Sequence, residues 1–235
     1  MSITYITGTN GDNLLQGNTF NRNRILALGG EDTLKGGTNS DTLYGGDGKD
    51  RLYAIGGVGN ILFGDNDEDR LYGSNFSDTL NGGRDNDTLF GNQSNDTLYG
   101  NEGNDVLDGD SGNDFLAGSS GNDTIHGDIG SDRLYGNDGN DWLFDATDNY
   151  RDSLYGGAGS DRFEISQIGD TWDVIGDFNS SEGDRFVFTL GQASDFNVDL
   201  RSGDGYIYHN SGELVAIAEN VTISDLEGTG FRSIS

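Results

Sequence analysis

The chain has 235 residues and a formal net charge of −28, with 41 acidic side chains against 13 Lys and Arg. Nucleic acid and anionic membranes repel such a charge, so neither is expected as a partner. The chain has no Cys, which excludes disulfides and thiolate metal sites, and no apolar run reaches the roughly 18 residues that a membrane helix needs, so no membrane insertion is expected.

The first 26 residues are the least regular part of the chain. They hold two degenerate units, around Asp12 and Asn23, which lack the regular glycine pattern found further on. The start also lacks the basic residues and apolar run of a cleaved secretion signal. We expect residues 1–26 to form capping turns at the N-terminal end of the fold.

Residues 27–164 repeat a nine-residue unit, most clearly in Gly100–Asp108 and Gly156–Glu164. The sixth residue of the unit is nearly always Asp, and the eighth is always large and apolar. The step between sixth residues is nine, except for ten after Asp50 and eleven after Asp141. A fixed short period of this kind predicts a solenoid. The eighth-position residues are Leu34, Leu43, Leu52, Leu62, Leu71, Leu80, Leu89, Leu98, Leu107, Leu116, Ile125, Leu134, Leu143, Leu154 and Phe163.

Each unit is expected to make one turn and one short strand. Glycines at the first, second and fourth positions permit the backbone angles of a tight turn. A three-residue strand then follows, with the eighth side chain pointing inward and the seventh and ninth pointing outward. Two units complete one coil, so the pattern predicts an all-β roll of two parallel sheets around a thin apolar core.

The sixth-position residues form two rows, because alternate units lie on the same edge of such a roll. The first, which we call the Asp32 row, contains Asp32, Asp50, Asp69, Asp87, Asp105, Asp123, Asp141 and Asp161. The second, the Asp41 row, contains Asp41, Asn60, Asp78, Asp96, Asp114, Asp132 and Asp152.

The Asp residues of both rows are candidate calcium ligands. Calcium takes six to eight hard oxygen ligands, which Asp carboxylates and turn carbonyls supply, whereas magnesium demands a stricter geometry. Asn60 offers only a neutral oxygen, so a weak site is expected there, and the insertion before Asp152 is expected to interrupt its row. The alternative is that these are ordinary turn residues. Because the hydrophobicity of the chain is low and its net charge is high, we expect the chain to stay unfolded until multiple calcium ions bind.

Residues 165–235 lose the repeat and are expected to form a small β cap at the C-terminal end. Two alternating runs, Tyr206–Tyr208 and Leu214–Ile217, predict a hairpin. The hairpin would cover the last sheet edge and the end of the apolar core.

The units Gly36–Tyr44 and Gly45–Tyr53 resemble the RTX (repeats-in-toxin, haemolysin-type) calcium-binding repeat of bacterial proteins exported by type I secretion. The resemblance implies a right-handed parallel β-roll with bound calcium, and a secreted protein. The segment Asp173–Phe178, followed by Gly183–Phe186, is similar to the one that follows the last repeats of serralysin-type proteases and alginate-epimerase R-modules. By that similarity, Asp173 and Asp177 complete or cap the final calcium sites, and residues 221–235 are a candidate signal for the type I secretion apparatus.

Three functions remain open from the sequence. The first is a secreted structural or adhesive protein at a cell-surface layer or matrix, which the initiator Met1 favours because it indicates a complete small protein. The second is a non-catalytic polysaccharide-binding module, suggested by outward aromatic residues at the ninth position, although these also suit strands by propensity alone. The third, an enzyme, is not expected, because the only histidines, His126 and His209, lie in no catalytic motif.

Overall fold

The computed structural model of the protein describes residues 2–57, 59–144, 148, 150–165, 173–179, 181–188, 196–201, 204–209, 214–218 and 232–233. All regular secondary structure in these ranges is β-strand. None of the described residues forms a helix that is long and apolar enough to cross a membrane.

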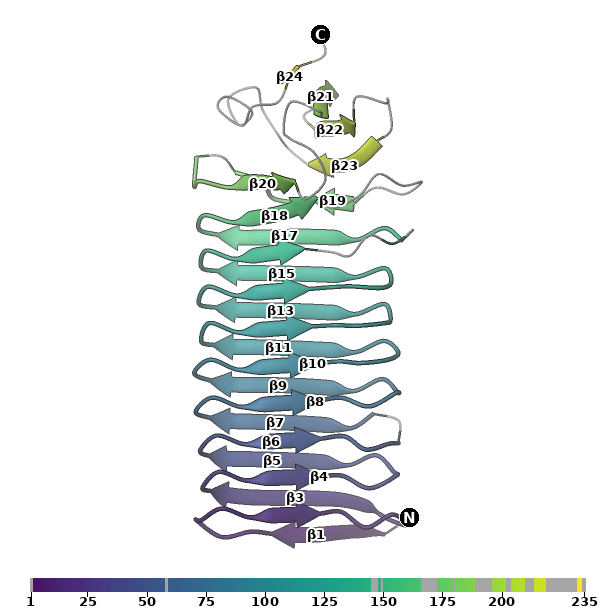
Figure 1. The fold of residues 1–235 in the computed structure, drawn as a ribbon, viewed down its shortest axis with the longest axis vertical. Coiled ribbons are helices and arrows are strands. Elements are labelled where there is room, and N and C mark those ends of the chain that lie inside the picture. The colour runs from purple at the N-terminus through teal and green to yellow at the C-terminus, as the bar shows by residue number, and fades with distance from the viewer. Residues whose placement is uncertain are drawn as a thin grey trace.

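The strands form two long sheets that face each other along the whole roll (Figure 1). Sheet A contains, in spatial order, β1 (Ile3–Thr7), β3 (Arg22–Gly29), β5 (Thr42–Asp47), β7 (Ile61–Asn66), β9 (Thr79–Arg84), β11 (Thr97–Glu102), β13 (Phe115–Ser120), β15 (Arg133–Asp138), β17 (Ser153–Ala158), β19 (Asp173–Ile175), β23 (Leu214–Ala218), β22 (Asp204–His209), β21 (Phe196–Arg201) and β24 (Arg232–Ser233). Sheet B contains β2 (Leu14–Gln16), β4 (Thr33–Lys35), β6 (Arg51–Tyr53), β8 (Arg70–Tyr72), β10 (Thr88–Phe90), β12 (Val106–Asp108), β14 (Thr124–His126), β16 (Trp142–Phe144), β18 (Arg162–Ile165) and β20 (Arg185–Phe188).

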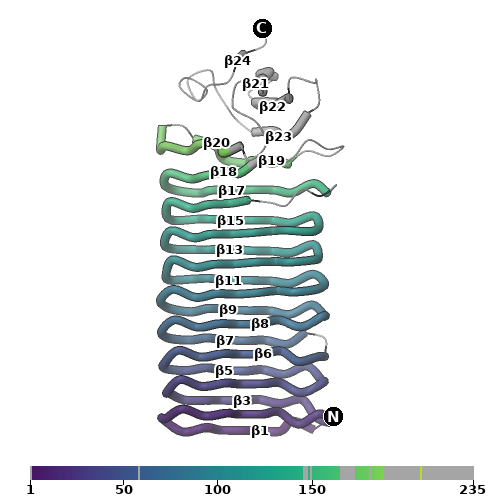
Figure 2. Tube along the Cα trace, viewed as in Figure 1, coloured from purple at the N-terminus to yellow at the C-terminus, as the bar shows by residue number. Residues whose placement is uncertain are grey.

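The chain alternates between the sheets, and each coil adds one strand to each of them. Thr88 lies beside Val106 in sheet B, and Thr97 lies beside Phe115 in sheet A, so the usual offset between neighbours is two units. Figure 2 follows this regular path from the N-terminal end upward. The predicted all-β parallel roll is therefore confirmed.

The core is a double ladder of the eighth-position side chains. Leu89, Leu98 and Leu107, from successive units, are completely buried, as are nearly all other members of the series. Each inward side chain packs between its equivalents one coil before and after, since their backbones are hydrogen-bonded in register. The apolar core is thus only one side chain deep in each sheet. Contacts between the turns are therefore also needed to hold successive coils together.

The strands of the two sheets differ in length, which the sequence analysis did not predict. Sheet B strands such as β10 have the expected three residues, but sheet A strands such as β11 have six. In β11 the pairing continues past the glycine turn, with Asn101 beside Ser119 and Glu102 beside Ser120. Identical repeat glycines therefore serve a turn on one side of the roll and a continued strand on the other.

The N-terminal residues form a coil in register with the rest. Ile6 of β1 lies beside Ile25, and Leu15 of β2 lies beside Leu34. Both Ile6 and Leu15 are only partly buried, in contrast to their inner neighbours. The proposed boundary after residue 26 falls within β3, and the division into three regions stays a prediction.

The C-terminal end of sheet A is extended by other strands. β19 pairs in parallel with β23, and β22 pairs antiparallel with β23, which confirms the predicted hairpin. Ile207 from this hairpin is buried as part of the main apolar core. Apart from Arg232 and Ser233, the candidate export signal lies outside the described residues.

Candidate metal centres along the turns

The sixth-position carboxylates stack as two continuous rows, one on each edge of the roll. One oxygen of each carboxylate accepts a hydrogen bond from the backbone N–H of its equivalent one coil earlier. Oδ1 of Asp105 accepts from Asp87 N at 2.7 Å, and Oδ1 of Asp123 accepts from Asp105 N at 2.7 Å. In the Asp41 row, Oδ1 of Asp114 accepts from Asp96 N at 2.6 Å. The structure thus brings the predicted candidates together in the order of the two rows.

The second carboxylate oxygen of most of these residues is buried and has no hydrogen-bond donor among the described residues. Leaving a buried charged oxygen without a partner is costly, so such atoms indicate a missing ligand. This group of Oδ2 atoms belongs to Asp32, Asp50, Asp69, Asp87, Asp96, Asp105, Asp114, Asp123, Asp132, Asp141 and Asp161.

The space beside these oxygens is kept open by a glycine at the first position of the unit, except at Asp32, whose unit has Ala27 there. A Cβ placed on Gly91 would lie 2.8 Å from Asp96 Oδ2 and 2.8 Å from the carbonyl oxygen of Gly109. The carboxylate of one coil and a carbonyl of the next therefore face the same small space. Hard oxygen donors of this kind fit calcium, so the residues present fit the predicted ion.

Burial raises the pKa of these Asp residues in the metal-free protein. Desolvation is the main cause, and it raises the pKa of Asp69 to about 9 and the pKa of Asp87 and of Asp132 to about 8. The neighbouring carboxylates of the same row raise the pKa further. Without a cation, the ionised form of these buried carboxylates is therefore unfavourable, and each carboxylate would bind either a proton or a metal ion.

Asn60 interrupts the Asp41 row in a specific manner. Its amide nitrogen donates to the carbonyl oxygens of Gly56 at 3.0 Å and Gly57 at 3.1 Å, and to Asp78 Oδ1 at 2.7 Å. Asn23, one unit before Asp32, donates in the same way to two carbonyls and to the carboxylate one coil on. The amide group thus connects oxygens that a cation would otherwise connect, which gives a physical reason to expect a weak site at Asn60.

Two predicted ligands of the Asp41 row have protein donors on their second oxygen. Oδ2 of Asp41 accepts from the backbone N–H of Gly37. Oδ2 of Asp78 accepts from the backbone N–H of Ser74 at 2.7 Å and from the Ser74 hydroxyl at 2.8 Å. In this row the buried second oxygens without a donor therefore begin at Asp96, a difference between the two edges that the repeat alone does not reveal.

The C-terminal end of the rows differs in part from the prediction. The insertion before Asp152 does not break its row, because Oδ1 of Asp152 accepts from Asp132 N at 2.6 Å. Asp173 continues that row by accepting from Asp152 N at 3.2 Å, while Asp177 accepts from the N–H groups of Gly156 and Gly157 at 2.9 Å.

Asp184 is a row member that the sequence analysis missed. Its Oδ1 accepts from Asp161 N at 2.9 Å, and its Oδ2 accepts from Asn179 N at 2.8 Å, so it ends the Asp32 row. The signal for it was present, because Asp184 and Phe186 repeat the Asp and apolar positions of the unit. It was obscured because the step from Asp161 is 23 residues.

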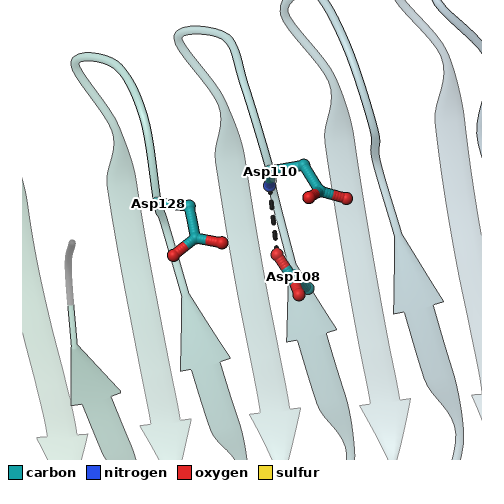
Figure 3. Close-up of side chains that lie close together, drawn as sticks. All are labelled: Asp108, Asp110 and Asp128. Atoms are coloured by element: carbon teal, nitrogen blue, oxygen red, sulfur yellow. Dashed lines mark hydrogen bonds between the residues drawn. The ribbon is translucent and has the colours of Figure 1, made fainter.

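A third acidic group lies outside both rows and was also not predicted. The carboxylates of Asp108, Asp110 and Asp128 come from adjacent coils, with oxygens within 4.8 Å of one another (Figure 3). Asp110 N donates to Asp108 Oδ1 at 3.1 Å. Burial, together with the charges of Asp110 and Asp128, raises the pKa of Asp108 to about 7.

The outward aromatic side chains at the ninth position stack on one another. Tyr72 of β8 stacks between Tyr53 and Phe90, with ring centroids 4.8 Å and 5.2 Å apart and interplanar angles of 5° and 9°. Tyr135 and Tyr155 of sheet A form a similar pair, 4.8 Å apart. Because neighbouring rings in these stacks cover each other's faces, it is chiefly the ring edges and the tyrosine hydroxyls that face solvent.

One family matches this chain. The family model described as the RTX calcium-binding nonapeptide repeat (4 copies) matches residues 26–60, 55–80, 63–96, 72–107, 81–116, 108–143 and 147–164. These matches together cover more than half of the chain and include both rows of carboxylates from Asp32 to Asp161. Among curated proteins, no sequence matches.

Proposed function

Since this chain belongs to the RTX calcium-binding nonapeptide repeat family, we propose that it is a secreted, non-catalytic protein whose β-roll forms when calcium binds outside the cell. Its role is structural or adhesive, at a cell surface or in a matrix. The observation that supports this proposal most is the series of buried carboxylate oxygens without donors, repeated coil after coil.

Calcium acts here as a link between coils. When bound, the ion supplies positive charge to oxygens that the protein leaves without donors. The Asp residues of the two rows would hold it, with turn carbonyls such as that of Gly109 beside Asp96. The same carboxylates accept backbone N–H bonds through Oδ1, which fixes their orientation. Without an ion, neighbouring carboxylates within each row repel one another, and bound ions would remove that repulsion.

An extracellular setting suits this chemistry. Repeated sites made of single carboxylates and carbonyls resemble the weaker calcium modules that fill at about 10⁻⁴–10⁻³ M. Such concentrations are typical of the outside of a cell. A chain that stays unfolded inside and folds outside would also be suited to export through the type I secretion apparatus, which we propose as its route.

A polysaccharide partner gains no support from the aromatic residues. Sugars stack on exposed ring faces, but the faces of Tyr72 are covered by Tyr53 and Phe90. The ladder is better explained as a stabiliser of the roll, through stacking between adjacent strands. Polysaccharide binding therefore stays an untested alternative, with retention on immobilised glycan only in calcium as its test.

Calcium titration followed by far-UV circular dichroism tests the proposal. We expect a coil spectrum in chelator at neutral pH and a β spectrum at millimolar calcium. Magnesium at equal concentration is the matched control and should be much less effective. A β spectrum in chelator at neutral pH, or equal action of the two cations, would refute calcium-dependent folding.

A further inference from the structure

The two ends of the roll differ in how sheet A and the apolar core are covered, whereas sheet B, in the part of the chain that the structure describes, ends in a strand with one partner, β2 or β20, at each end. At the C-terminal end, β23 and β22 extend sheet A, and Ile207 closes over the core. At the N-terminal end, β1 pairs only with β3 and β2 pairs only with β4 among the described strands (Figure 1). Each of these terminal strands therefore has one edge with unpaired backbone groups, on the side away from the roll.

The apolar core is also incompletely covered at this end. Ile6 and Leu15 are the last members of the core ladder, and both are only partly buried. Around them, Tyr5 is 69% exposed, Leu14 is 72% exposed and Phe20 is 84% exposed. Tyr5 and Leu14 are outward residues of the two edge strands, and exposed apolar side chains on open edge strands favour contact with another protein surface.

Charge at this end favours a copy of the same chain as the partner. Residues 2–21 contain one charged side chain, Asp12, although the whole chain carries a net charge of −28. Natural proteins usually protect open sheet edges with charged side chains or Pro, and β1 and β2 contain neither. Along the repeats from Asp32 to Asp161 two copies would repel each other strongly, whereas this end is nearly neutral.

We propose that two copies of this chain associate through their N-terminal ends, with the edges of β1 and β2 pairing across a twofold axis. Edge strands related by such an axis run antiparallel, which allows regular ladder hydrogen bonds. The contact closes on itself, because a twofold axis pairs the same surface of both copies. The dimer joins the two apolar cores and doubles the length of the roll.

The molar mass of the printed chain in millimolar calcium tests this proposal, measured by light scattering after size-exclusion chromatography. We expect twice the chain mass, and a monomer mass at tens of micromolar protein would overturn the proposal. Circular dichroism of the same sample shows that the roll is folded, which separates failure to dimerise from failure to bind calcium.

Substitutions at the end locate the contact. The double variant Tyr5→Lys with Leu14→Lys places like charges opposite each other in the dimer and should yield monomers. The control Ile129→Lys changes an apolar residue of similar exposure, 54%, on a turn far from this end, and should stay dimeric. A dimer that survives the double variant, or one that Ile129→Lys abolishes, would also overturn the proposal.

Cross-linking gives a second readout that does not depend on weakening the contact. The chain has no Cys, so one introduced thiol reports on one position. Tyr5→Cys should form a disulfide-linked dimer in mild oxidant and calcium, whereas Ile129→Cys should not. Equal cross-linking of the two variants would contradict an N-terminal contact.

Discussion

A single carboxylate does two tasks in each coil of this protein. Oδ1 of Asp105 accepts the N–H of Asp87 and so belongs to the backbone framework, whereas its Oδ2 is buried without a donor. Replacing Asp by Asn retains the first task and ends the second, as Asn60 demonstrates by donating to Gly56 and Gly57. Asp at the sixth position therefore leaves an oxygen that a cation can neutralise, whereas Asn places an amide donor there instead.

Asn60→Asp should create a calcium site in the Asp41 row. The new carboxylate would face Asp78 Oδ1 and two carbonyls to which the amide now donates. We expect one additional calcium ion per chain and lower stability in chelator, because the amide donor is lost. Metal analysis of the folded, desalted protein would measure the change. An unchanged calcium content would contradict the role given to the Asn60 amide.

Removing two adjacent carboxylates should weaken calcium binding far more than changing an exposed one. In the variant Asp105→Asn with Asp123→Asn, a lost charged ligand costs about 1.5–3 kcal/mol, which is a tenfold or larger rise in the calcium midpoint. The control Asp138→Asn alters an exposed residue at the end of β15 and should leave the midpoint unchanged. Equal midpoints for the two variants would show that the rows are not the binding sites.

At the scale of the elements, the nine-residue period predicted the features that recur in every unit, but not those that differ between units. It predicted the rows, the core ladder and the offset between strands, because each depends only on spacing. It did not predict the six-residue strands of sheet A, because glycines such as Gly100 are typical of turns yet here lie within β11. Hydrogen-bond donors that occur in only one unit, such as Ser74 toward Asp78, also cannot be predicted from the repeat.

The stacked rings of sheet B should contribute to the stability of the roll. Tyr72 has a ring on each side, whereas Tyr53 has one ring neighbour in this ladder. Tyr72→Leu keeps much of the apolar surface but removes two stacks, each worth about 0.5–1.5 kcal/mol. Urea unfolding in saturating calcium should therefore show a larger loss for Tyr72→Leu than for Tyr53→Leu. Equal losses would show that stacking adds nothing beyond apolar contact.

For the whole molecule, folding depends on whether the thin apolar core of fifteen regular units outweighs the repulsion of a large negative charge. Nearly all the carboxylates that oppose folding lie in the turns, where cations also bind. Calcium and protons are therefore alternative ways to neutralise the same buried groups. Sequence composition predicts a dependence on a cation, which stays a prediction, whereas the unequal donors along the two edges required the structure.

In chelator, the metal-free protein should be more structured in acid than at alkaline pH. Burial raises the folded-state pKa of Asp69 to about 9 and of Asp132 to about 8, above the value of about 3.9 for an unfolded chain. The stability that protonation supplies is then fully present below pH 4, falls as pH rises, and is lost once pH has passed through about 8–9.

Far-UV circular dichroism at low micromolar protein, in chelator from pH 4 to pH 9, measures this effect. With calcium present the trend should reverse, because protons compete with the cation and the calcium midpoint should rise as pH falls. A chelated protein that is equally unfolded at pH 4 and pH 9 would contradict the raised pKa values.

The regular offset between neighbouring strands has a consequence for inheritance. Because Thr88 and Val106 occupy equivalent places 18 residues apart, losing or duplicating a stretch of that length leaves every remaining side chain facing its former direction. Slippage of replication between repeated DNA segments produces such changes in one step. Length could thus vary among descendants without any need to redesign the interior.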